Sequence, residues 1–154
     1  MNQAQPTPPS ATNAAVGSSG LAWYARHSIE LAAVLGFLSV AAGAFGTHAL
    51  GDVVTPTRLN TFEVGARYQM YHALALLVVS VLPTTCRLAA AFWFWGSVIF
   101  SGSLYLLVLL NVPILGAVAP IGGLLQLLGW GWLFWGARQA ATSNSPSFTQ
   151  RDRA

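Results

Sequence analysis

The feature that most constrains this chain is a stretch without a single charged side chain, which runs from residue 88 to residue 137. Asn111, Val112 and Pro113 form a turn signal inside it and divide it into two apolar runs, 88–110 and 114–137. A helix needs about 20 apolar residues to cross the hydrocarbon core of a bilayer. Both runs reach that length, so the sequence predicts two consecutive transmembrane helices.

The composition of the whole chain agrees with a lipid environment. Only 7% of its 154 residues are charged, whereas soluble domains carry about 25%. So few charges cannot cover the surface of a soluble globule, which excludes an ordinary water-soluble fold. The net charge of +3 does not indicate nucleic-acid binding, because the arginines are scattered singly between apolar runs.

Two further crossings are predicted in the first half of the chain. Residues 29–50 form an apolar run that is broken only by Glu30 and His48. The next run is purely apolar only over 73–82, so a crossing there must begin near residue 64 and include polar residues. A cleavable signal peptide is the alternative interpretation of the first run, but that run is too long for one.

A short amphipathic segment is predicted to lead into the second crossing. Thr55 followed by Pro56 is typical of a helix start, with a capping side chain and proline in the first turn. Leu59, Phe62 and Ala66 then recur at helical spacing, which suits a helix at the membrane surface.

These observations predict an all-α integral membrane four-helix bundle with four spans, about 29–50, 64–82, 88–110 and 114–137. They divide the chain into a disordered tail (1–27), a four-span domain (28–138) and a polar tail (139–154). Low hydrophobicity and abundant Pro, Ser, Thr and Asn give the first tail little to bury.

Arginine and tryptophan predict the orientation. With four spans, one side collects five arginines, Arg26, Arg87, Arg138, Arg151 and Arg153, and the other only Arg58 and Arg67. The positive-inside rule then places both termini in the cytoplasm. All six tryptophans fall in the half nearest the arginine-rich side, as an interfacial belt would.

Two series of small residues are candidate helix-packing positions. Ser39, Gly43 and Thr47 repeat every four residues, and Gly122, Gly129 and Gly136 repeat every seven. Small residues at such spacing let transmembrane helices approach closely. They predict packing within the bundle, with a homo-oligomer seam as the alternative.

A polar cluster is predicted in the half of the bundle away from the arginine-rich side. Its members are His48, Glu63, Arg67, Gln69, His72, Ser101 and Tyr105. Polar side chains at membrane depth are a functional hypothesis by default. The alternatives are hydrogen bonds that fix helix register, a ligand or proton site, and a metal site, for which the spacing gives no support.

No catalytic arrangement is visible in the sequence. It contains no nucleophile with a recognisable base, no glycine-rich phosphate loop and no paired carboxylates in the membrane, and Cys86 stands alone. We therefore expect no enzyme and no cofactor. The leading hypothesis is a membrane component that binds a partner protein or lipid. The alternative is a small-solute or proton-coupled transporter or channel that uses the polar cluster.

Four short motifs resemble a known family. They are GAFGTH at 43–48, YQMYHALA at 68–75, FSGSLY at 100–105 and PIGG at 120–123. Together they resemble the domain of unknown function 423 family of small bacterial inner-membrane proteins, related to the transmembrane protein 256 group of eukaryotes. The resemblance covers about residues 29–137 and implies a four-helix integral membrane protein without an established activity. Thr47 stands where that family usually has a smaller residue such as alanine.

Overall fold

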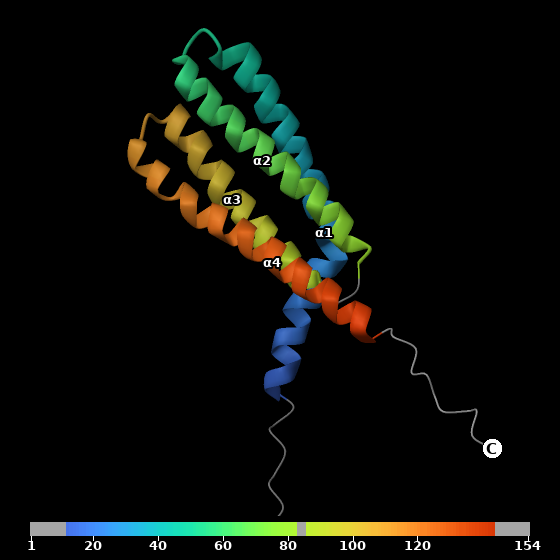
Figure 1. Ribbon diagram of the computed structural model, residues 1–154. Helices are drawn as coiled ribbons and strands as arrows, with labels where there is room; N and C mark the ends of the chain where they lie inside the picture. Colours follow the sequence, from blue (N-terminus) through green and yellow to red (C-terminus); the bar gives the residue numbers. More distant parts are fainter. Residues whose placement is uncertain (1–11, 83–85, 144–154) are drawn as a thin grey trace, which may run out of the picture.

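The structure is a computed structural model that describes residues 12–82 and 86–143, and it consists of four long α-helices (Figure 1). These are α1 (Thr12–Phe45), α2 (Pro56–Ser80), α3 (Arg87–Leu109) and α4 (Ala119–Ser143). A π-helical turn, η1 (Gly46–Leu50), continues α1, and a 3-10 turn, η3 (Pro113–Ala117), precedes α4. The described ranges contain no strand. The predicted all-α integral membrane bundle is confirmed.

Three segments are long and apolar enough to cross a membrane, namely His27–Leu50, Arg87–Leu109 and Pro113–Thr142. They coincide closely with the predicted first, third and fourth spans. The predicted second span, 64–82, falls largely in α2, which is long enough but less apolar than the other three. The crossing of α2 stays a prediction, and its place in the bundle supports it.

The helices are arranged almost as a row. α2 packs between α1 and α3, α3 packs against α4, and α1 also contacts α3. The chain runs up and down, so α1 begins and α4 ends at one end of the molecule, while η1 and η3 lie at the other (Figure 1). The Arg58 guanidinium donates a hydrogen bond to Asn111 Oδ1 and thereby links the two hairpins at the η1 end.

The bundle buries several polar side chains beside an apolar core and exposes other large apolar side chains on its outside. The buried polar residues are Ser28, Ser39, Gln69, His72, Ser97, Ser101, Ser103 and Gln126. Large apolar side chains such as Phe37, Leu74, Leu127 and Phe134 are exposed along all four helices. Exposed apolar surface on this scale marks contact with another apolar phase, here the lipid of the bilayer.

Local signals set several helix boundaries as predicted. Thr55 caps α2 by accepting a hydrogen bond from the Arg58 backbone N–H, and Pro56 is the first helical residue. Asn111 adopts φ 55°, a left-handed conformation that asparagine tolerates and that closes the turn between α3 and α4. Pro120 lies in the first turn of α4, shortly after the 3-10 turn.

The structure differs from the prediction for the tails. Residues 12–27, predicted to be disordered, belong to α1, and residues 139–143 belong to α4. A helix that is already formed in the bundle extends without the cost of a new nucleus, and the Ala residues at positions 14 and 15 favour the helical state. The rest of both predicted tails, 1–11 and 144–154, lies outside the described residues.

Glycines allow α3 and α4 to cross with their backbones nearly in contact. A Cβ atom added at Gly122 would lie 2.4 Å from the Phe100 nitrogen and 2.8 Å from the Gly96 carbonyl oxygen. One added at Gly129 would lie 2.5 Å from Trp93 Nε1. Gly136, the third member of this series, is also buried. Any side chain at Gly122 would force the two helices apart, and one at Gly129 would displace the Trp93 ring.

Candidate functional site

Gln69 on α2 joins three helices at the centre of the bundle. Its Nε2 donates a 2.9 Å hydrogen bond to the Leu35 carbonyl oxygen on α1, and its Oε1 accepts a 3.0 Å hydrogen bond from the Tyr105 hydroxyl on α3. The Gln69 side chain is only 4% exposed. Both ends of its amide therefore have partners inside the protein.

Two buried serines make similar connections between helices. Ser101 on α3 donates a 2.8 Å hydrogen bond to the Gly65 carbonyl oxygen, and Ser39 on α1 donates a 2.7 Å hydrogen bond to the Ala66 carbonyl oxygen. Of the predicted polar cluster, Gln69, Ser101 and Tyr105 thus come together. Their polar atoms are engaged with one another or with backbone carbonyls, which leaves no open polar path among them.

His72 occupies a different surface of α2, where it faces α4. Its Nδ1 lies 2.8 Å from the Tyr68 carbonyl oxygen, which can only accept, so Nδ1 carries the proton. Its Nε2 then accepts a 3.3 Å hydrogen bond from Trp130 Nε1 on α4. The two bonds specify a neutral imidazole with one tautomer. The ring also lies beside Trp93, with 6.4 Å between the ring centroids.

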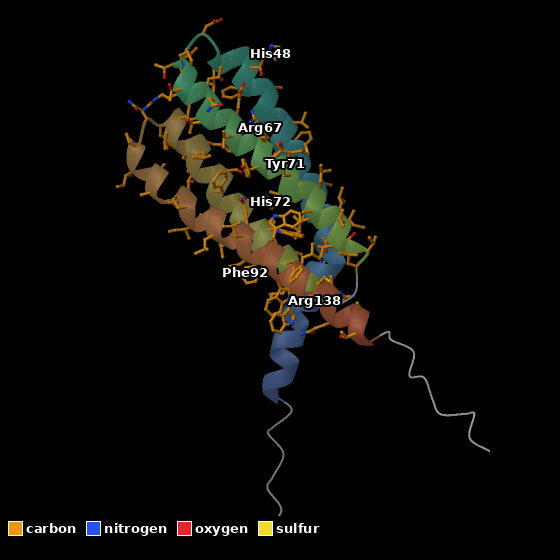
Figure 2. The ribbon with its side chains drawn as sticks, in the orientation of Figure 1. His48, Arg67, Tyr71, His72, Phe92 and Arg138 are labelled. Atoms are coloured by element: carbon orange, nitrogen blue, oxygen red, sulfur yellow. The ribbon has the colours of Figure 1, made fainter. Side chains whose placement is uncertain are left out.

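His48 does not join His72. It lies in η1 with its side chain exposed, at the upper end of the molecule in Figure 2, whereas His72 lies near the middle. The two histidines therefore do not converge on one cavity. In the part of the chain that the structure describes, no group of three or more His, Cys, Asp and Glu side chains is placed to hold a metal ion.

Glu63 and Arg67 line a groove between α1 and α2, which we call the α1–α2 groove. Its volume is about 410 Å³. The lining residues are Ser39, Gly43, Thr47, Glu63, Ala66, Arg67, Met70 and Tyr71. Arg67 and Tyr71 lie along α2 above His72 in Figure 2. The small residues of α1 form one wall of this groove, and a Cβ atom added at Gly43 would meet nothing within 4 Å.

The charges in the α1–α2 groove are not paired with each other. Among residues 12–82 and 86–143, neither the Glu63 carboxylate nor the Arg67 guanidinium has an ion-pair or hydrogen-bond partner, although the two residues are one helical turn apart. Arg67 is exposed and Glu63 is half-buried. Both charges are therefore available to a ligand that enters the groove from the side.

A second groove lies between α2 and α4, with Phe100 of α3 at its base, and we call it the α2–α4 groove. Its volume is about 530 Å³. The lining residues are Tyr68, His72, Phe100, Pro120, Gly123, Leu124, Gln126, Leu127 and Trp130. None of these residues carries a formal charge when His72 is neutral. The walls are chiefly aromatic and aliphatic, so the groove is suited to an uncharged molecule.

Three buried polar atoms around α3 and α4 have no hydrogen-bond partner among the described residues: Trp93 Nε1, Ser97 Oγ and Gln126 Nε2. Such atoms are rare in folded proteins and each needs an explanation. Sequence reasoning missed Gln126 and Trp130 as site residues. The signal was present, because Gln126 is the only amide side chain in the otherwise apolar run 114–137.

The comparisons with known proteins agree with the fold. Residues 42–123, more than half of the chain, match the family described as "Protein of unknown function (DUF423)". A membrane protein named UPF0382 from Staphylococcus epidermidis is 44% identical over 106 residues, which are 66% of this chain and 87% of the relative. No solved structure matches the chain.

Two further relatives extend the range of bacteria. The UPF0382 membrane protein YwdK of Bacillus subtilis is 40% identical over 108 residues, 66% of this chain and 88% of the relative. The UPF0382 inner membrane protein YgdD of Escherichia coli is 35% identical over 119 residues, 73% of this chain and 89% of the relative. The chain is a membrane protein that belongs to the DUF423 family, as the four motifs in its sequence predict.

Proposed function

We propose that this protein is a non-enzymatic component of the bacterial inner membrane that binds phospholipid in the α1–α2 groove. The observation that carries the proposal is a pair of charges, Glu63 and Arg67, that have no partner among the described residues. They lie in a lateral groove of a bundle whose outer surface is otherwise largely apolar. A charged side chain at membrane depth is costly unless it is paired or reaches polar surroundings. A lipid headgroup supplies such a partner.

The chemistry of the groove favours a zwitterionic headgroup. The Arg67 guanidinium matches a phosphate, which it binds through two parallel N–H donors. The Glu63 carboxylate, one helical turn closer to the η1 end, matches the ammonium group of phosphatidylethanolamine. The groove opens to the side, so a lipid enters it from the bilayer without leaving the membrane.

Lipid retention tests this function. We expect wild-type protein purified in mild detergent to retain phosphatidylethanolamine, as measured by native mass spectrometry, and Arg67→Gln or Glu63→Gln to lower the retained fraction severalfold. Phosphatidylglycerol, which lacks the ammonium group, is expected to respond to Arg67→Gln alone. Arg87→Gln removes an equal charge outside the groove and serves as the control. Equal retention by all four proteins would refute the proposal.

Transport, the alternative function, has less support. A solute path would need open polar groups along the bundle, whereas Gln69, Ser101 and Tyr105 are hydrogen-bonded within it. An enzymatic role likewise lacks a nucleophile placed beside a base in the polar junction of α1, α2 and α3. These contacts support a binding protein over a transporter or an enzyme.

We also propose that both termini face the cytoplasm. The first described residues of α1 and the last of α4 lie at the same end of the molecule (Figure 1), and that end has the larger number of arginines in the sequence. Reporter fusions at residues 1 and 154 are expected to give cytoplasmic signals. A periplasmic signal from either fusion would disprove this orientation.

A further inference from the structure

The α2–α4 groove has a depth and a chemistry that differ from those of the α1–α2 groove. Gln126 lies within two residues of the middle of the membrane-spanning segment Pro113–Thr142, and Phe100 lies two residues from the middle of Arg87–Leu109. The hydrocarbon core is about 30 Å thick. The groove is therefore centred about 15 Å from either headgroup region.

This depth excludes the polar part of a phospholipid as the occupant. Phosphate and ester groups stay near the edges of the hydrocarbon core, so they cannot reach Gln126 without a large deformation of the bilayer. An occupant with a polar atom at this depth must be uncharged and soluble in hydrocarbon. The absence of a formal charge among the lining residues is consistent with that requirement.

The groove also has an unused donor. Gln126 lines it, is only 5% exposed, and has no hydrogen-bond partner for its Nε2 atom among the described residues. Of the other polar groups at the groove, His72 and Trp130 are bonded to each other, and Tyr68 contributes a hydroxyl. The Gln126 amide is therefore a buried N–H donor at the wall of the groove that lacks an acceptor, such as a carbonyl oxygen.

Aromatic rings define the shape of the occupant. The Tyr68 and Phe100 rings lie with their centroids 5.5 Å apart, and Trp130 lines the groove beside His72, 6.3 Å from ring to ring. Aromatic walls favour a flat ring, which they contact by stacking or edge-on. Leu124 and Leu127 then offer apolar contacts for a chain attached to that ring.

We propose that the α2–α4 groove binds a quinone-type lipid, an uncharged ring with carbonyl acceptors and an apolar tail. The ring lies among Tyr68, Phe100 and Trp130, one carbonyl oxygen accepts a hydrogen bond from Gln126, and the tail leaves toward the bilayer. This is a binding site, and no electron transfer is implied. It shares no lining residue with the α1–α2 groove, so each of the two binding proposals can be refuted without affecting the other.

Binding of decylubiquinone, a short-chain quinone, tests the site. The protein is placed in phosphatidylcholine nanodiscs, and saturable quenching of tryptophan fluorescence is measured. We expect Gln126→Met to weaken the apparent Kd at least tenfold because it removes the donor and keeps the side-chain length. Gln139→Met is the matched control on the same helix outside the groove, and its Kd is expected to equal that of wild type.

A second pair of variants tests the volume of the groove. Gly123→Leu fills it, and the first added carbon is tolerated, because a Cβ atom there would lie 3.8 Å from the Phe100 ring. Gly131→Leu is the control, since a Cβ atom at Gly131 would meet nothing within 4 Å. We expect loss of saturable quenching in Gly123→Leu and wild-type quenching in Gly131→Leu.

Unfolding temperatures distinguish a lost site from a lost fold. Because Gln126 Nε2 has no hydrogen-bond partner in the described part of the chain, Gln126→Met is expected to melt at or above the wild-type temperature while it binds the quinone more weakly. The proposal is overturned by quenching that is non-saturable and equal in all variants, by a Kd that Gln126→Met leaves unchanged, or by displacement of decylubiquinone by dioleoylglycerol, which would assign the groove to a glycerolipid.

Discussion

The two hairpins of this bundle hold their helices together in different ways. α1 and α2 are joined by polar side chains, since Ser39 and Gln69 each reach a carbonyl oxygen on the opposite helix. α3 and α4 are joined by close backbone approach at Gly96 and Gly122, and Gly129 makes room for the Trp93 side chain. In lipid, where the hydrophobic effect gives helices little reason to associate, these are two alternative sources of attraction.

The difference between the hairpins has consequences for the surfaces that they leave open. In the hairpin held by side-chain hydrogen bonds, Gly43 makes no close contact with the neighbouring helix. It lines the α1–α2 groove instead, together with the charged residues Glu63 and Arg67. In the hairpin held by glycine contacts, polar atoms such as Ser97 Oγ have no partner among residues 12–82 and 86–143. Small residues at regular spacing therefore mark close packing in one hairpin and an open groove in the other.

The largest effect is expected from an added methyl group at Gly122. Gly122→Ala places a Cβ atom against the backbone of α3, which overpacks the crossing and should lower the free energy of unfolding by about 2 to 3 kcal/mol. Gly43→Ala makes no such contact and should be neutral or stabilise by up to about 1 kcal/mol, because alanine is the better helix former. Denaturation in mixed micelles measures both. Equal losses would show that both glycines act in packing.

An intermediate effect is expected when the junction at Gln69 is removed. Gln69→Leu eliminates two hydrogen bonds between helices and leaves the Tyr105 hydroxyl without its partner, which should cost about 1 to 2 kcal/mol. Tyr105→Phe removes one bond and should cost about 0.6 kcal/mol. A double-mutant cycle on the two residues reports their coupling, and a coupling energy of zero would contradict the observed contact.

The smallest change in the free energy of unfolding is expected when either of two buried serines, Ser39 or Ser97, is replaced by alanine. Ser39→Ala removes a 2.7 Å hydrogen bond to the Ala66 carbonyl oxygen and should destabilise the bundle by about 0.6 kcal/mol. Ser97→Ala removes a hydroxyl that has no partner in the described ranges and should be neutral or slightly stabilising. The same unfolding assay compares them, and a larger loss for Ser97→Ala would reveal a partner for its hydroxyl.

The fold could be predicted from the sequence because lipid imposes a strong and local requirement. Apolar runs of about 20 residues must be helices in lipid. The boundaries of these helices are marked by Pro56, Asn111 and Pro120. α2 was the uncertain element, since its apolar stretch is short and polar residues fill its first half. The structure explains how these are accommodated, because Gln69 and His72 are bonded within the bundle.

The candidate site was less predictable, because it depends on which helix faces which. His48 and His72 look alike in sequence, yet one is exposed in η1 and the other is buried against Trp130. Trp93 was predicted to belong to an interfacial belt but is 1% exposed in the core, and the side chain of Trp23 lies outside the described residues. Rotation of a helix about its axis decides these outcomes, and a single sequence specifies it only weakly.

The hydrogen bonds of Gln69 bear on how the polypeptide enters the membrane during its synthesis. α2 is the least apolar of the four helices, and its buried amide has no partner until α1 lies beside it. A lone α2 would have to leave that amide in hydrocarbon. Insertion of α1 and α2 as a preformed pair avoids the cost of an unpaired amide in lipid. Once α3 has been synthesised and inserted, Tyr105 supplies the second hydrogen bond of Gln69.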